Sequence, residues 1–237
     1  MKKIIISFVL LLITLILLLF LLRKDNSNKF KTVSILSVNQ VDKIDTEKKI
    51  VEIAPDYSYK ININYPYTGY NNLNIQIENL IKKYLSDFIN SDRPPLENQI
   101  YSLDITYDTY KFESKVSYVF TIFLSTGGAH PNTIIETISY DTKINQIITI
   151  DTMLEQNSNI LNVLSESSRN ILASNKDLMQ TNIRDMFLDG TKPTTTNYQN
   201  FAFTNDGLLI FFNRYQIAPY SYGSFQVLIP YSNLGIL

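Results

Sequence analysis

Several residue types are absent or nearly absent from this chain of 237 residues, and each absence excludes a class of site. There is no cysteine, so disulfides, thiol nucleophiles and lipoprotein anchors are excluded. A single histidine, His130, cannot build the zinc sites that combine several His or Cys residues. No acidic loop has the clustering that calcium needs. We therefore expect no metal site and no cofactor.

Catalytic motifs are also missing. A Ser-His-Asp arrangement would have to use His130 as its base, yet the Gly-x-Ser-x-Gly elbow that presents the nucleophile is absent. A carboxylate pair of the kind that hydrolyses glycosides remains formally possible, although no spacing separates the acidic residues of the strand-like segments from ordinary solvated side chains. These observations predict that the protein is not an enzyme and has no catalytic residue.

One long hydrophobic run is present near the N-terminus. Residues 4–22, from Ile4 to Leu22, carry no charge, and a helix of that length can cross a hydrocarbon core about 30 Å thick. The run ends in Leu-Leu-Arg-Lys without a small-residue cleavage site, so we favour an uncleaved anchor over a cleaved signal peptide. We expect a single-pass protein of the cell membrane whose C-terminal domain is extracytoplasmic.

The charge balance of the remaining chain limits its partners. Residues 25–237 contain 17 of the 21 Lys and Arg and all 22 Asp and Glu, so their formal net charge is −5. This balance argues against a nucleic-acid partner. It suits a cationic protein, but ordinary solubility requires the same modest negative charge and is the favoured explanation. The abundance of Asn, Ile, Lys and Tyr resembles proteins of low-GC Gram-positive bacteria.

The hydrophobic patterning predicts an α+β fold. Alternating apolar residues over 57–65 indicate a strand that Pro66 ends, and an apolar stripe over 72–90 indicates a helix that Asn71 or Asn72 caps. Further strands are expected at 100–110, 116–124, 134–140, 146–150, 200–204, 208–214 and 225–229, with helices at 159–174 and 177–187. This order predicts antiparallel sheets with packed helices, in two sequential lobes after one N-terminal transmembrane helix.

The same features divide the chain into four parts. We expect a membrane anchor over residues 1–24 and a tether over 25–49. The first lobe then covers residues 50–125 and the second covers 126–237.

A constrained loop supplies the first candidate binding residues. Gly127 and Gly128 allow backbone angles that other residues avoid, and Pro131 favours an extended conformation for His130. The imidazole then either holds the turn through hydrogen bonds to the backbone or contacts a ligand directly. The sequence leaves both readings open.

A tyrosine-rich segment near the C-terminus supplies the second group. Tyr215, Pro219, Tyr220 and Tyr222 lie within nine residues, and tyrosine rings provide large contact areas for a protein or a sugar at low entropic cost. A packed loop explains the same residues equally well.

Five motifs, in their order and spacing, resemble the extracytoplasmic domain family DUF3298. They are TGGAHP at 126–131, ITIDTML at 148–154, FTNDGL at 203–208, YQIAPY at 215–220 and IPY at 229–231. Residues 51–124 resemble, with less specific motifs, the DUF4163 or PdaC-type domain that often precedes it. The resemblance covers most of residues 50–234.

The resemblance implies a function in the cell envelope. In RsiV-type anti-sigma factors this pair of domains is an external lysozyme receptor, and in PdaC-type peptidoglycan deacetylases it precedes a metal-dependent catalytic domain. Three residues precede the hydrophobic run and the chain ends at Leu237, so we expect neither sigma-factor sequestration nor a deacetylase domain. The resemblance then implies a membrane-anchored module that recognises a lysozyme-like protein. The alternatives are a peptidoglycan-binding module or, less favoured, an envelope hydrolase.

Overall fold

The computed structural model describes residues 38–41, 45–56, 58–93 and 100–235. All described residues belong to one compact unit, Ile35–Leu237. The expected anchor at residues 4–22 lies outside the described residues. Within the described ranges, no helix combines the length and the apolarity that crossing a membrane requires.

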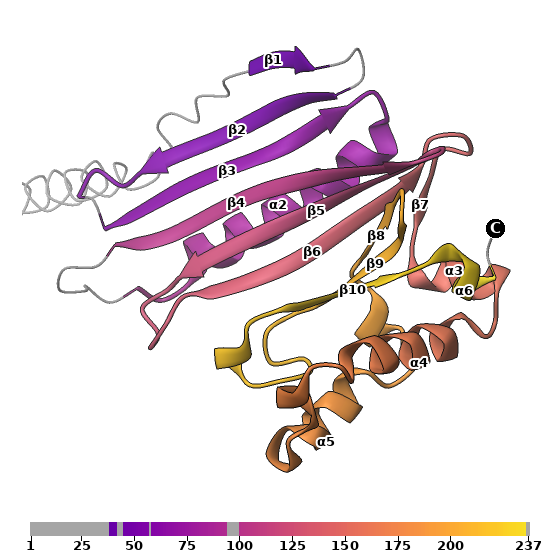
Figure 1. Ribbon diagram of the computed structural model, residues 1–237. Coiled ribbons are helices and arrows are strands. Elements are labelled where there is room, and N and C mark those ends of the chain that lie inside the picture. The colour runs from indigo at the N-terminus through magenta and orange to yellow at the C-terminus, as the bar shows by residue number, and fades with distance from the viewer. Residues whose placement is uncertain (1–37, 42–44, 57, 94–99, 236–237) are drawn as a thin grey trace, which may run out of the picture. The chain divides into compact units, whose positions relative to one another are not determined.

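A seven-stranded sheet forms the N-terminal half of this unit, and its strand order follows the chain order (Figure 1). The strands are β1 Val38–Val41, β2 Asp45–Ile53, β3 Tyr59–Thr68, β4 Tyr101–Phe112, β5 Lys115–Ser125, β6 Asn132–Asp141 and β7 Gln146–Ile148. All neighbours pair antiparallel except β3 and β4, which are parallel. The expectation of purely antiparallel sheets is wrong for this pair, because a helical crossover connects the two strands.

That crossover is helix α2, Asn71–Asn90, which covers one face of the sheet (Figure 1). Its buried side chains include Leu73, Ile77, Ile81 and Phe88, at the three- and four-residue spacing of one helix face. They form a hydrophobic core with inward-facing residues of β3 to β6. The predicted helix is confirmed.

The predicted cap of α2 is not observed. Its N-cap residue is Tyr70, and no side chain caps that position. Instead Asn74, in the first turn of α2, accepts a hydrogen bond from the Thr68 N–H and donates one to the Thr68 carbonyl oxygen, both at 2.8 Å. The asparagine therefore fixes the approach of β3 to the helix.

The start of the sheet differs from the sequence prediction at two points. Val38–Val41 and most of Asp45–Ile53 form strands within the range assigned to a tether, and β3 continues through Pro66 to Thr68. Pro66 is tolerated because β4 pairs with β3 only as far as Ile63, so the proline faces one neighbouring strand, β2.

The C-terminal half combines helices with a second sheet of three strands in the order β10-β9-β8. Its helices are α3 Ile150–Gln156, α4 Ile160–Leu172, α5 Thr181–Gly190 and α6 Tyr231–Leu234. The strands are β8 Phe201–Thr204, β9 Gly207–Phe212 and β10 Phe225–Ile229. The described unit is thus a mixed α+β fold with two sheets.

Helix α3 was not predicted. The strand expected over 146–150 ends at Ile148, because Thr149 caps a helix that begins at the next residue. Thr149 Oγ1 accepts from the Thr152 N–H at 3.2 Å, and Thr152 Oγ1 accepts from the Thr149 N–H at 3.0 Å. Two threonines therefore form a capping box where the motif rule expects Glu or Gln at the second position. The expected helix over 177–187 is divided between a short 3₁₀ turn, Lys176–Met179, and α5.

The C-terminal half has its own hydrophobic core, built from α3 to α6 and β8 to β10. The predicted boundary between residues 125 and 126 falls between β5 and β6, which pair from Lys115–Asp141 to Leu124–Asn132 within one sheet. The second core begins after β7, so the structure changes character near residue 149.

Side chains join the two halves along β6. Strand β7 covers β6 only from Ser139 to Asp141, which leaves the earlier residues of that edge without a strand neighbour. Asn213 fills one position: it accepts from the Ile135 N–H at 2.7 Å and donates to the Ile135 carbonyl oxygen at 3.0 Å. Asn200 accepts from the Thr137 N–H at 3.2 Å. These amide groups replace a strand neighbour on that edge.

Candidate functional site

The loop between β5 and β6 begins the candidate site. Gly127 has φ +83°, and a Cβ atom there would lie 3.1 Å from Cε1 and Oη of Tyr101. Both the left-handed backbone and the nearby ring therefore require glycine. Gly128 has neither constraint, because the nearest atom to a Cβ there is the His130 carbonyl oxygen at 3.8 Å. Of the two predicted glycines, only Gly127 is required by its backbone conformation and its surroundings.

The structure brings the two candidate segments together. The imidazole of His130 stacks on the ring of Tyr220, with centroids 3.6 Å apart and planes inclined by 17°. The Tyr220 hydroxyl donates a hydrogen bond of 2.5 Å to the carbonyl oxygen of Pro131. A tyrosine 90 residues away in sequence thus fixes the histidine loop from the other side.

Tyr215 extends this aromatic group into solvent. Its side chain is 55% exposed, and its ring centroid lies 5.6 Å from that of Tyr220. Its backbone has φ +65°, a left-handed conformation that bulky residues rarely adopt. Residues held in such conformations cluster at binding and active sites. An exposed, strained tyrosine therefore marks this surface as the candidate binding site.

Arg214 belongs to the same group and was missed from the sequence. Its guanidinium carbon lies 4.3 Å from the centroid of the Tyr220 ring, a cation–π distance. Among the described residues, its buried Nε atom has no hydrogen-bond partner. The sequence offered one signal for Arg214, its position directly before the tyrosine motif. Arginine is common on protein surfaces, however, and the contact of Arg214 with Tyr220 depends on how the chain turns between the two residues.

Pro219 and Tyr222 have supporting positions. Pro219 precedes the short 3₁₀ turn Tyr220–Tyr222 that orients the Tyr220 ring. Tyr222 is half-buried and packs against the C-terminal core, so it lies apart from the exposed aromatic group. We call Gly127, His130, Pro131, Arg214, Tyr215 and Tyr220 the His130–Tyr220 corner.

Gln216 fixes the tyrosine segment to the C-terminal half. Its amide nitrogen donates to the Gly190 carbonyl oxygen at 3.3 Å and to the Asn197 carbonyl oxygen at 3.0 Å. A Cβ on Gly190 would lie 1.9 Å from the Gln216 carbonyl oxygen, so only glycine fits. The corner is therefore a rigid surface supported from both sides.

The chemistry available at the corner is stacking, hydrogen bonding and one imidazole. A cavity of about 220 Å³ lies beside it, lined by residues 125–131 and Ile100. Across the described part of the chain, no group of three or more His, Cys, Asp or Glu is arranged to hold a metal ion. The arrangement is suited to contact with a protein or a carbohydrate, and its imidazole is the one group there suited to proton transfer.

Comparison with known proteins identifies relatives of most of the chain. Residues 138–232 match the family described as "Protein of unknown function (DUF3298)". Immunogenic protein MPB64 of Mycobacterium bovis is 31% identical over 183 residues, which are 75% of this chain and 77% of that protein. A crystal structure of a DUF3298 family protein from Pseudomonas aeruginosa has a TM-score of 0.64 and 18% identity, covering 81% of this chain and 93% of that one.

Two further relatives contradict the prediction that the chain is not an enzyme. Esterase Rv3036c of Mycobacterium tuberculosis is 29% identical over 161 residues, 62% of this chain and 69% of that protein. Peptidoglycan-N-acetylmuramic acid deacetylase PdaC of Bacillus subtilis is 24% identical over 163 residues, 66% of this chain and 34% of that protein. The prediction rested on the absence of the Gly-x-Ser-x-Gly elbow and of zinc motifs with several histidines, and similarity to relatives named as hydrolases overturns that argument.

These relatives bear differently on the resemblance seen in the sequence. The DUF3298 domain is confirmed by both the family model and the shared fold. The match to PdaC is partial and distant, and the DUF4163 and RsiV resemblances stay predictions. This chain therefore belongs to the same family as MPB64, and its residues 138–232 form a DUF3298 domain.

Proposed function

We propose that this chain is a membrane-anchored, extracytoplasmic module of the cell envelope that binds a lysozyme-like protein at the His130–Tyr220 corner. The observation that carries the proposal is Tyr215, an exposed tyrosine in a left-handed conformation beside the stacked pair of His130 and Tyr220. Rigid aromatic side chains are the usual anchors of protein interfaces, because they bury large areas and lose little entropy.

The net charge supports a cationic partner. Residues 25–237 have a formal net charge of −5, and a lysozyme of the chicken type is cationic. Opposite charges would mainly accelerate the encounter, whereas the aromatic contacts would supply most of the affinity. Raising the salt concentration should therefore weaken the contribution of the charges and leave the contribution of the aromatic contacts.

Calorimetry with chicken lysozyme and the full-length chain in detergent tests the proposal. We expect calorimetry to show a one-to-one complex. Stopped-flow mixing should show slower association as salt rises from about 50 to about 300 mM, a range in which the Debye length falls through about 10 Å. Tyr220→Ala and Tyr215→Ala should each weaken binding by about tenfold or more. A lysozyme activity assay in parallel separates an inhibitor from a sensor.

Tyr67→Ala is the matched control, because Tyr67 is 41% exposed on β3 and outside the corner. Its affinity should equal that of the unaltered chain. No binding of lysozyme, or equal loss in the control, would refute the proposal. Binding to purified peptidoglycan, sensitive to the same two tyrosines but insensitive to salt, would replace it with the peptidoglycan alternative.

A hydrolase at the same corner is the second candidate, and the relative named an esterase favours it. The cavity beside the corner is lined by the hydroxyl-bearing Ser125 and Thr126 together with His130. An imidazole near a hydroxyl can act as the general base of ester hydrolysis. The site would then take an ester or acetyl group of an envelope polymer.

Hydrolysis of p-nitrophenyl acetate by the full chain tests this candidate. His130→Gln and Ser125→Ala should each lower kcat by at least about 100-fold if these residues are catalytic. Ser91→Ala, outside the cavity, is the control. Activity that persists in His130→Gln would exclude the corner as the active site.

A further inference from the structure

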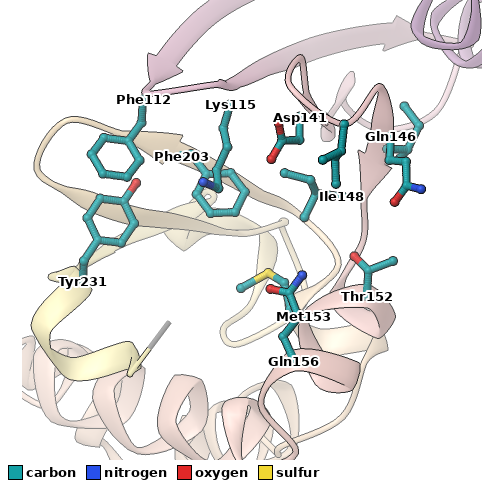
Figure 2. A pocket seen from close by; sticks show the side chains of 12 residues that line it. Phe112, Lys115, Asp141, Gln146, Ile148, Thr152, Met153, Gln156, Phe203 and Tyr231 are labelled. Atoms are coloured by element: carbon teal, nitrogen blue, oxygen red, sulfur yellow. The ribbon is translucent and has the colours of Figure 1, made fainter. Parts of the chain in front are cut away.

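A second cavity, of about 180 Å³, lies between the β6–β7 hairpin of the large sheet and helices α3 and α6 (Figure 2). None of its lining residues belongs to the His130–Tyr220 corner. Ligand sites are typically concave and combine apolar walls with a few converging polar groups. The lining of this cavity contains both kinds of side chain. We call it the hairpin cavity.

One wall of the hairpin cavity is aromatic and fixed. Phe112 stacks on Tyr231, with ring centroids 4.3 Å apart and planes inclined by 21°. The Tyr231 hydroxyl donates to the Thr204 carbonyl oxygen at 2.8 Å, and burial raises the pKa of Tyr231 to about 12. This wall therefore stays neutral and in place. It can hold an apolar side chain.

The opposite wall carries two charges. Lys115 and Asp141 are direct partners across β5 and β6, and both side chains point toward the cavity in Figure 2. Directly opposed residues have Cβ atoms about 5 Å apart. In the described part of the chain these two form no ion pair with each other. The pairing partner of Lys115 is Glu113, at 3.9 Å and with a side chain that is 63% exposed. The Lys115 ammonium can therefore accept a stronger anionic partner.

Asp141 supplies a fixed negative charge beside that ammonium. Burial alone would raise the pKa of Asp141, but hydrogen bonds from the backbone of Lys143, the side chain of Ser114 and the backbone of Ile144, together with Lys115, lower it. The bond from the Lys143 N–H measures 2.8 Å. The carboxylate thus stays ionised and keeps one orientation.

Two amide side chains complete the lining. The side chains of Gln146 and Gln156 face the cavity in Figure 2, and within the described residues neither side-chain amide forms a hydrogen bond. A primary amide offers two N–H donors and a carbonyl acceptor. Such groups match the backbone amides of a peptide.

We propose that the hairpin cavity binds a short peptide with a free C-terminal carboxylate. Lys115 pairs with the carboxylate, Asp141 accepts from the amino or amide nitrogen, and the aromatic wall holds a small side chain. A free C-terminal carboxylate on a short peptide occurs both in peptides made by the ribosome and in the D-alanine peptides of peptidoglycan.

Calorimetry or NMR titration of the full-length chain with L-alanyl-L-alanine and D-alanyl-D-alanine tests the proposal. At least one dipeptide should bind with a dissociation constant below about 1 mM, which is reasonable for a ligand of this size. The enantiomer that binds identifies the source. The amidated dipeptide should bind about tenfold more weakly, because it lacks the carboxylate that pairs with Lys115.

Variants distinguish this site from the corner. Lys115→Met keeps most of the side-chain length and should weaken binding by about tenfold, and Lys115→Arg should restore it. Lys143→Met is the matched control, because Lys143 is exposed on the same hairpin and does not line the cavity. Tyr220→Ala should leave dipeptide binding unchanged, so a failure of the corner proposal does not affect this one. No binding of either dipeptide, or undiminished binding by a folded Lys115→Met chain, would overturn the proposal.

Discussion

The two halves of the described unit are stabilised in different ways. The N-terminal half is a regular ladder of seven strands with one helix packed on it, and its core residues follow strand and helix periodicity. The C-terminal half depends more on single contacts: asparagine side chains that pair with β6, and glycines that allow two backbone segments to touch. A ladder distributes its stability over many small terms. The C-terminal half has an extensive hydrophobic core of its own, and the candidate binding corner is built on the single contacts that it adds to that core.

The largest expected effect comes from a methyl group in the C-terminal half. In Gly190→Ala the new Cβ would lie 1.9 Å from the Gln216 carbonyl oxygen, so one of the two segments must move. We expect the free energy of unfolding to fall by about 3 kcal/mol. Gly69→Ala is the control in the other half, because no atom lies within 4 Å of a Cβ there. Denaturant titration followed by circular dichroism measures both. Equal effects would remove the contrast between the halves.

Asn213→Ala tests the asparagine contacts. It removes both hydrogen bonds to the backbone of Ile135 and leaves that edge of β6 unpaired. We expect a loss of about 2 kcal/mol in the free energy of unfolding. Asn162→Ala is the control, because Asn162 is exposed and its side chain donates only to the side chain of Asn159, the N-cap residue of α4. A loss below about 0.5 kcal/mol would mean that water replaces the amide without cost.

Two buried tyrosine hydroxyls allow one measurement in each half. Tyr84 donates to Glu136 at 2.7 Å, and Tyr231 donates to Thr204 at 2.8 Å. Tyr84→Phe and Tyr231→Phe should each cost about 1 kcal/mol at pH 7.

The same tyrosines predict a loss of stability in alkali. Burial raises the pKa of both, with Glu136 adding to the effect at Tyr84, and the pKa of Tyr231 is about 12. Because unfolded tyrosine ionises near pH 10, this stabilisation is complete below about pH 10 and is lost as pH rises toward the folded values. Urea midpoints from pH 8 to 11.5 should fall, and each Phe variant should flatten that fall. If the urea midpoints of the Phe variants fell with pH as steeply as those of the unaltered chain, the alkaline loss of stability would not come from these tyrosines.

The smallest expected effect has the opposite sign. Tyr215→Asn replaces a tyrosine at φ +65° with a residue that tolerates this conformation, as Asn145 does at φ +57°. We expect a gain of about 0.5 kcal/mol in stability together with weaker lysozyme binding. A loss of stability would mean that the Tyr215 ring contributes more by packing on Tyr220 than its backbone costs.

The sequence predicted regular elements well and their exceptions poorly. The stripe from Leu73 to Phe88 identified α2 because helix periodicity is local, and strand-like patterning at 200–204 and 208–214 identified β8 and β9 for the same reason. Pro66 was read as a strand end because the sequence does not reveal that only one strand pairs with β3 at that position. Helix α3 was missed because its cap uses Thr152, and threonine alone is a weak helix signal.

The candidate corner was predictable in part. The glycine–histidine loop and the tyrosine segment were each recognised from composition, but the stacking of His130 on Tyr220 joins residues 90 positions apart. The role of Arg214 and the strain at Tyr215 depend on the turn that the tertiary structure imposes. The hairpin cavity left no sequence signal, because its residues come from seven separate elements.

The sequence by itself determined the α+β class, most strands and helices, and the DUF3298 resemblance, because these depend on local periodicity and on motifs of consecutive residues. The tertiary structure decided the parallel pair of β3 and β4, the amide pairing along β6, and which aromatic residues meet at the corner. Those features arise from contacts between distant segments. Their energies depend on distances of a few ångströms that no local pattern encodes.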